Sequence, residues 1–357
     1  MKASRLRLFA CLLVVSLAAC DGDTGDNSRA SGGGGVSSGG SGGIAAGGSS
    51  GGAVSGGSGG LSTGGSGGGG GAQAGGAGGS TPVPCPAYVD GATTGNLEFG
   101  AITEASGVAA SRKTADVLFI NNDSGDGPKL YVAKKSGQHL GVLTLAGAVA
   151  IDWEDIAIGP GPKSGESYLY AGDIGDNAHA RQKVVVYRAV EPKVDVSAAA
   201  QDLTLDPVEA FSLTYPDGAH DAETLMVDAK TGDLFIVAKS ADGTSPVYRK
   251  AAPLGSGELE KISTLQFGSG SLPGAKLTTG GDISASGDAI LIRTYGSAFL
   301  FRRAPGQSVA AALAGEPCPV PVASEPQGEA IGFAADETGY FTLSEGTKQP
   351  LYFFAKN

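Results

Sequence analysis

Acidic residues recur through the chain beside short apolar runs, and they are the residues most able to do chemistry. The series consists of Glu104, Glu154, Glu223, Asp282 and Glu329. Carboxylates that a fold brings together repel one another unless they are paired, protonated or bound to a metal. If the fold brings this series together, its members must therefore be paired with cations, protonated or bound to a metal.

A second series of polar residues follows the next apolar run of each repeat. It contains Asp123, Asp173, Asp176, Lys239 and Arg293. We expect the two runs of a repeat to be antiparallel neighbours, so the start of one and the end of the other lie at the same edge. Both series are then predicted to converge on the mouth of a central channel.

Three interpretations of this mouth remain open. In the first, the acids cap turns and pair with Lys239 and Arg293, which would hold the repeats in register. In the second, carboxylates coordinate Ca²⁺, a cation that prefers oxygen ligands, and the candidate ligands are Asp123, Glu154, Asp173 and Asp176. In the third, Lys239 and Arg293 bind an anionic substrate that a metal also contacts. The predicted ligand-binding residues are Glu104, Asp123, Glu154, Asp155, Asp173, Asp176, Glu223, Lys239, Asp282, Arg293 and Glu329.

The segments that would position these residues are predicted to be strands. From Cys85 onward, short runs of β-branched and aromatic residues alternate with Gly, Asp and Pro turns, and no stretch shows a helical period. Five repeats of about 50 residues with four strands each are typical of a β-propeller. A sixth blade would follow if the long spacing between Glu154 and Glu223 contained a degenerate one, and an irregular β-sandwich is the alternative fold.

The last repeat ends at the C-terminus after its third strand. Residues 97–102, just before the first repeat, can supply the missing fourth strand. Such a pairing would close the ring and remove the open sheet edges.

The N-terminus has the features of a bacterial lipoprotein. Lys2, Arg5 and Arg7 precede an apolar run over residues 8–17, which is too short to span a bilayer as a helix. The run ends in Leu-Ala-Ala before Cys20, which matches a lipobox. We predict a signal peptide over 1–19 and a lipid anchor on Cys20, with an ordinary secretory signal as the alternative.

Residues 20–84 are predicted to be a disordered tether, and residues 85–357 the folded domain. The tether is almost entirely Gly, Ser, Ala and Thr, which cannot bury enough apolar surface to offset the entropy of ordering. The expected location is extracytoplasmic, on the outer membrane or cell surface rather than the inner membrane. The membrane is the predicted partner through the lipid.

Net charge indicates which partners the protein can bind, and the cysteine content indicates whether it has a disulfide. The net charge of −11 is unfavourable for nucleic-acid binding, which needs basic patches. Cys85 and Cys318 are the pair that remains after processing, and an oxidising compartment favours a disulfide between them.

Several short motifs bring a family to mind. Those at residues 104–107, 122–126, 153–157, 172–177, 221–223 and 327–330 resemble secreted bacterial propeller proteins of mostly unknown function, loosely grouped with phytase-like propellers. The resemblance implies a propeller over about 97–357. Since true propeller phytases are calcium-dependent, Ca²⁺-dependent hydrolysis of phosphate or other esters is the alternative to binding a small polar ligand or cation.

Overall fold

A computed structural model describes residues 84–267 and 275–357. The predicted signal peptide, the predicted lipid anchor on Cys20 and nearly all of the predicted tether lie outside these residues. Within the described residues, no helix is long and apolar enough to cross a membrane.

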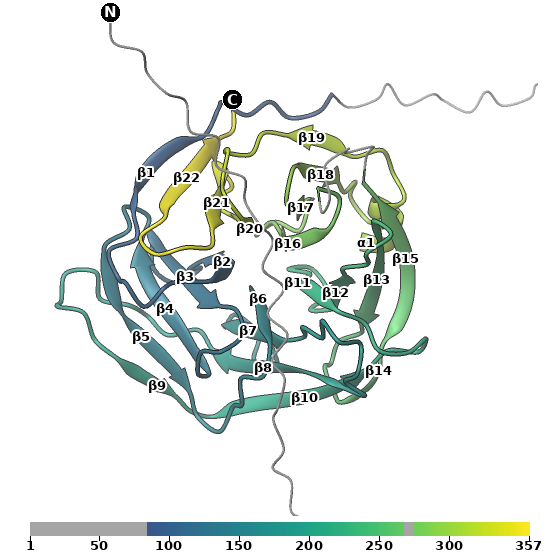
Figure 1. The fold of residues 1–357 in the computed structure, drawn as a ribbon, viewed down its shortest axis with the longest axis horizontal. Coiled ribbons are helices and arrows are strands. Elements are labelled where there is room, and N and C mark those ends of the chain that lie inside the picture. Colours follow the sequence, from purple (N-terminus) through teal and green to yellow (C-terminus); the bar gives the residue numbers. More distant parts are fainter. Residues whose placement is uncertain (1–83, 268–274) are drawn as a thin grey trace, which may run out of the picture. The chain divides into compact units, whose positions relative to one another are not determined.

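Five mostly antiparallel sheets surround a central channel, so the fold is a five-bladed β-propeller (Figure 1). Blade 1 contains β2 (Ala105–Ala110), β3 (Val117–Asn122), β4 (Lys129–Lys134) and β5 (His139–Leu145). Blade 2 contains β6 (Trp153–Pro160), β7 (Ser167–Asp173), β8 (Val184–Val190) and β10 (Val208–Thr214). Blade 3 contains β11 (Ala222–Val227), β12 (Leu234–Ala238), β13 (Thr244–Lys250) and β15 (Glu260–Gln266). Blade 4 contains β16 (Thr278–Ile283), β17 (Ala289–Thr294), β18 (Ala298–Arg302) and β19 (Cys318–Val320), with the short helix α1 (Val309–Leu313) before β19. Blade 5 contains β20 (Gly328–Phe333), β21 (Gly339–Ser344), β22 (Pro350–Ala355) and β1 (Ala92–Asn96).

An N-terminal strand closes the ring, as the sequence predicts, but it is not the predicted segment. β1 pairs with β22, whereas residues 97–102 form no strand. Leu97 and Ile102 are each 1% exposed and pack in the core between blades 1 and 5. Because their apolar side chains enter that core, the more polar residues before them form the backbone hydrogen bonds with β22.

The predicted disulfide is also present. Cys85 and Cys318 are bonded, with a Cα–Cα distance of 5.6 Å. Cys318 begins β19 in blade 4, while the chain just after Cys85 leads into blade 5. The bond therefore joins two neighbouring blades across a sequence separation of 233 residues.

The long spacing between Glu154 and Glu223 does not contain a sixth blade. Part of it forms β9 (Leu203–Leu205), which pairs in parallel with β5 at the outer edge of blade 1. A similar addition, β14 (Gly257–Glu258), pairs in parallel with β10 at the edge of blade 2. Both additions cover outer strands that would otherwise present unpaired backbone groups.

Apolar cores fill the five spaces between neighbouring blades. β3 shows the pattern, since all six of its residues are buried. Val117 and Phe119 belong to the core shared with blade 2, while Leu118 and Ile120 belong to the core shared with blade 5. Successive side chains of a strand point to opposite faces, so a blade covered on both faces needs a continuous apolar run.

Candidate functional site

The same irregularity interrupts the innermost strand of every blade. In each pairing of the first strand with the second, the register shifts by one residue near the start of the first strand. The extra residues are Ser106, Glu154, Glu223, Thr279 and Glu329. A bulge of this kind turns a side chain away from the regular alternation. Three of the five predicted acids therefore occupy one equivalent position around the channel.

The register differs from the prediction at the two other acids. Glu104 lies before β2 and is exposed, and Ser106 holds the equivalent position in blade 1. Asp282 is near the end of β16 rather than at its start, and Thr279 holds the equivalent position there. The prediction that each repeat opens with an equivalent acid is wrong for these two, because sequence spacing does not show where a bulge falls.

A second ring of side chains follows the ends of the second strands. It contains Asp123, Ile174, Lys239, Tyr295 and Glu345. The bulge residues and this ring lie at the same end of the channel. We call this end the mouth, and define it by Asp123, Asp152, Glu154, Glu223, Lys239, Tyr295, Glu329 and Glu345.

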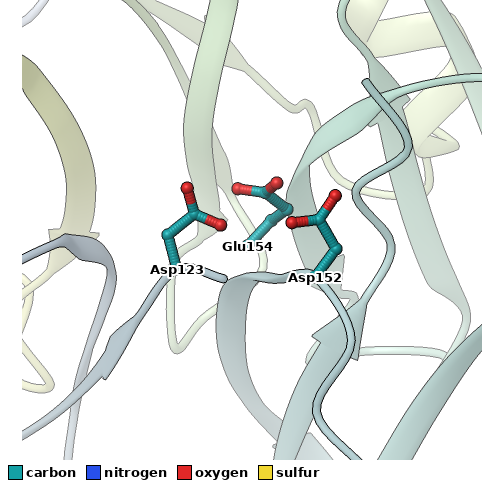
Figure 2. A group of neighbouring side chains, drawn as sticks. All are labelled: Asp123, Asp152 and Glu154. Carbon is teal, nitrogen blue, oxygen red and sulfur yellow. The ribbon is translucent and has the colours of Figure 1, made fainter. Parts of the chain in front are cut away.

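Three carboxylates converge on one side of the mouth. One ligand oxygen from each of Asp123, Asp152 and Glu154 lies within 4.8 Å of the others (Figure 2). Asp123 and Glu154 were predicted metal ligands, whereas Asp152 was not predicted. Asp152 lies two residues before Glu154, a spacing that could have indicated it, since alternate residues of an extended chain share a side.

Burial and mutual repulsion both oppose the charging of these groups. Burial, together with the charges of Asp152 and Glu329, raises the pKa of Asp123 to about 7, although the hydrogen bond from the Ser124 N–H opposes this rise. The pKa of Glu154 is well above its usual value, because Glu154 is buried and because Glu223 and Asp123 repel it. Burial likewise raises the pKa of Asp152. Among the described residues, no ion pair involves any of these three carboxylates.

A glycine forms the wall behind this cluster. A Cβ atom on Gly175 would lie 2.3 Å from Glu154 Oε1 and 2.5 Å from Asp152 Oδ2. The Gly175 N–H donates to the Asp152 carbonyl at 3.1 Å. A side chain at this position would displace the two carboxylates, whereas glycine lets the backbone approach them closely.

Lys239 lies on the opposite side of the mouth. Of the two predicted cations, Lys239 and Arg293, it is the one in the mouth. The Lys239 ammonium donates to Glu223 Oε1 and, at 3.3 Å, to the Tyr295 hydroxyl. The Tyr295 hydroxyl donates to Glu329 Oε1 at 3.1 Å. Burial raises the pKa of Glu223 to about 8, although the Lys239 charge opposes this rise. Burial together with the Glu329 charge raises the pKa of Glu345 to about 8.

Asp173 and Asp176 hold the loop behind the cluster. Asp173 pairs with Arg181 at 2.9 Å and accepts the N–H of Asp152 at 3.0 Å. Asp176 accepts the N–H groups of Ala180 and Arg181 at 2.9 and 2.8 Å. Their oxygen atoms are not among those that converge with Asp123, Asp152 and Glu154. Arg181 therefore pairs with Oδ1 of one predicted metal ligand, Asp173, whose Oδ2 is buried and has no hydrogen-bond partner.

Arg293 lies inside the protein rather than in the mouth. It is 1% exposed and pairs with Glu325, which is equally buried and was not predicted. It also donates to the Ala330 carbonyl at 3.1 Å. These contacts connect blade 4 with blade 5, which matches the interpretation that a cation holds repeats in register.

Two further predicted acids lie deeper in the channel, and we call them the floor. Asp155 accepts N–H groups from Ile156 at 2.8 Å and from Leu225 of the next blade at 2.9 Å, and Gly281 of blade 4 also donates to it. Asp282 accepts the N–H of Phe333 in blade 5 at 2.9 Å. The floor carboxylates therefore bond to the backbones of neighbouring blades.

No protein-family model matches the chain, and no curated protein matches it. Solved structures do match, among them one titled "Structure of U3-55K". That structure is 11% identical, and the match covers 70% of this chain and 79% of the other with a TM-score of 0.35.

Proposed function

We propose that this propeller binds a divalent cation, preferably Ca²⁺, at the mouth of its channel. The observation that supports the proposal is the convergence of Asp123, Asp152 and Glu154 within 4.8 Å. Glu154 is buried and Asp123 and Asp152 are half-buried, and carboxylates that face one another in such a place need a counter-charge. Among the described residues none of the three forms an ion pair, although the Arg181 charge opposes the rise in the pKa of Asp152.

The donor set suits a hard cation. Ca²⁺ takes six to eight oxygen ligands, and carboxylates can each supply one or two. Three carboxylates leave positions for water or for a bound molecule. A site that binds through oxygen alone would disfavour soft metals, which prefer sulfur and imidazole ligands.

Calorimetric titration of Ca²⁺ into the chelator-stripped full-length chain tests the proposal. We expect saturable binding that raises the melting temperature, since a ligand that binds only the folded state stabilises it. Asp152→Asn should abolish this binding, while Glu316→Gln should leave it unchanged, because Glu316 is exposed and lies outside the cluster. Equal binding by wild type and Asp152→Asn would contradict the assignment.

We also propose that Cys20 carries a lipid that attaches the propeller to a membrane outside the cytoplasm. The support is the basic start, the short apolar run and the lipobox. Replacement of Cys20 by Ser should move the protein from the membrane fraction to the soluble fraction. An unchanged membrane fraction would contradict the anchor.

A further inference from the structure

Residues 84–96 run along the outer edge of blade 5, where β1 lies beside β22 (Figure 1). Every residue of this segment, which we call the strap, is exposed or half-buried, and the first buried residue after it is Leu97. The side chains of β1 are all small or polar. Because the strap adds little to an apolar core, its attachment depends on backbone hydrogen bonds and on how its two ends are held.

The backbone of the strap bonds mainly to the end of the chain. Beyond the pairing of β1 with β22, the Val89 N–H donates to the Ala355 carbonyl at 2.9 Å. The Asn357 N–H donates to the Ala87 carbonyl at 3.0 Å. Segments whose backbone bonds face solvent and that have few buried apolar contacts open locally at a lower free energy than the whole fold. The strap is therefore the part of blade 5 that can separate while the blades stay folded.

The two ends of the strap are held in different ways. At one end, the strap continues into Leu97, which is buried in the core between blades 1 and 5. At the other end, Cys85 is exposed and is bonded to Cys318, which is buried at the start of β19. Arg302 Nη1 also donates to the Pro84 carbonyl at 3.1 Å. The disulfide therefore fixes the end that no apolar core holds.

The strap covers a pair of stacked aromatic rings. The ring centroids of Tyr340 and Phe354 are 4.9 Å apart, and the Tyr88 ring of the strap contacts the Tyr340 ring edge-on at the same separation. At Gly91 the strap backbone lies so close to the Phe354 ring that a Cβ atom would be 2.5 Å from it. β22 itself contains no charged residue. Release of the strap would therefore uncover an uncharged and largely apolar strand edge.

From these contacts we propose that the Cys85–Cys318 disulfide is a redox-sensitive latch that keeps the strap on blade 5. When the bond is reduced, the strap separates from β22, while the apolar cores between the blades keep the rest of the ring folded. Disulfides persist in oxidising compartments and are reduced in reducing ones. Blade 5 is then complete in an oxidising compartment and open at its outer edge in a reducing one.

A dithiol can reduce this bond from the Cys85 side, because Cys85 is exposed whereas Cys318 is buried. One thiolate of the dithiol attacks Cys85 Sγ, and Cys318 leaves as a thiolate. The second thiolate of the dithiol then attacks the dithiol sulfur of the mixed disulfide, and Cys85 leaves as a thiolate. The dithiol is thereby oxidised to a cyclic disulfide, and the two cysteine thiolates take up protons from water.

Hydrogen–deuterium exchange of the full-length chain, with and without dithiothreitol, tests the proposal. After reduction we expect the amides of residues 87–96 and 351–355 to exchange about tenfold faster or more, and those of β6 and β7 to exchange as before. Trp153, the only tryptophan, lies in the core between blades 1 and 2, so its fluorescence emission should not shift. Unchanged exchange over the strap would overturn the proposal. A simultaneous shift of the Trp153 emission would also overturn it, because the disulfide would then stabilise the whole fold rather than the strap.

Two variants identify the cysteines responsible. Cys85→Ser removes the bond at an exposed residue, so its strap should exchange as fast as that of the reduced wild type, and dithiothreitol should have no further effect. Cys20→Ser, the matched control, keeps the disulfide and should respond to dithiothreitol as the wild type does. Slow exchange over the strap of Cys85→Ser, or loss of the response in Cys20→Ser, would contradict the latch. If Cys85→Ser does not fold, reduction of the wild type still decides the question.

Discussion

The mouth and the floor of the channel both contain carboxylates, but these have different neighbours. At the floor, Asp155 and Asp282 accept backbone N–H groups from neighbouring blades. At the mouth, Asp123, Asp152 and Glu154 face one another. Burial raises the pKa in both layers, to about 6 for Asp282 and to about 7 for Asp123. The comparison shows that the partners of a buried acid, rather than its burial, distinguish a structural acid from a candidate ligand.

The largest effect should come from the floor. Asp155→Ala would leave the N–H groups of Leu225 and Gly281 without their acceptor. Each unsatisfied buried donor costs about 1–3 kcal/mol, so the free energy of unfolding should fall by about 3 kcal/mol or more. Urea denaturation measures this change.

Asp155→Asn serves as the control, since the amide keeps one acceptor oxygen and should recover part of the loss. Wild-type stability in Asp155→Ala would show that the floor carboxylate does not connect the blades.

At the mouth, we expect replacement of an acid to raise the stability of the metal-free protein rather than lower it. Asp152→Asn removes one of three mutually repelling charges, so the metal-free protein should gain about 1 kcal/mol of stability at pH 8. The same variant should lose the stabilisation by Ca²⁺. Thermal melting with EGTA and with Ca²⁺ measures both, and a loss of stability in EGTA would remove the distinction between the two layers.

The wall of the mouth gives an intermediate test. Gly175→Ala would place a methyl group against the Glu154 and Asp152 carboxylates and displace them. Ca²⁺ affinity should fall about tenfold, which corresponds to about 1.4 kcal/mol. Gly165→Ala is not a suitable control because Gly165 has a positive φ, whereas Gly100 has neither a positive φ nor a neighbour within 4 Å. Gly100→Ala should leave the affinity unchanged.

The most gradual effect should be the change of stability and of Ca²⁺ affinity with pH. The pKa of Asp123 is about 7 in the folded protein and lower in the unfolded chain, so the folded state binds more protons between these values. Stability of the metal-free protein should therefore fall as the pH rises from about 4 to 7. Ca²⁺ affinity should rise over the upper part of the same range, because the metal displaces the protons. Melting scans and titrations at several pH values measure the two trends. If stability and Ca²⁺ affinity changed in the same direction, protons and Ca²⁺ would not compete for the same carboxylates.

Ca²⁺-dependent hydrolysis of phosphate or other esters is the alternative function, and the same preparation can test it. The excess negative charge of the mouth opposes an anionic substrate, so we expect no Ca²⁺-dependent release of phosphate from p-nitrophenyl phosphate. Turnover that Asp152→Asn abolishes would reverse this expectation and make the cation site catalytic.

Much of the fold could be predicted because the apolar pattern records it directly. Residues 117–120 form a continuous apolar run, and a strand whose two faces enter two cores requires such a run. The closing strand was misplaced because Leu97 and Ile102 look like strand residues, whereas their side chains pack in a core. Pairing with a strand more than 200 residues away leaves little local trace.

The repeat pattern of the sequence is enough to predict equivalent acids in three of the five blades, at Glu154, Glu223 and Glu329. Which of the acids come together depends on how the strands and loops fold. The bulges turn those three side chains into the channel, Asp152 joins Asp123 and Glu154 from a loop, and Arg293 withdraws to Glu325 between two blades. The physical reason is that a one-residue shift in a strand changes the direction of a side chain without changing the composition of the sequence around it.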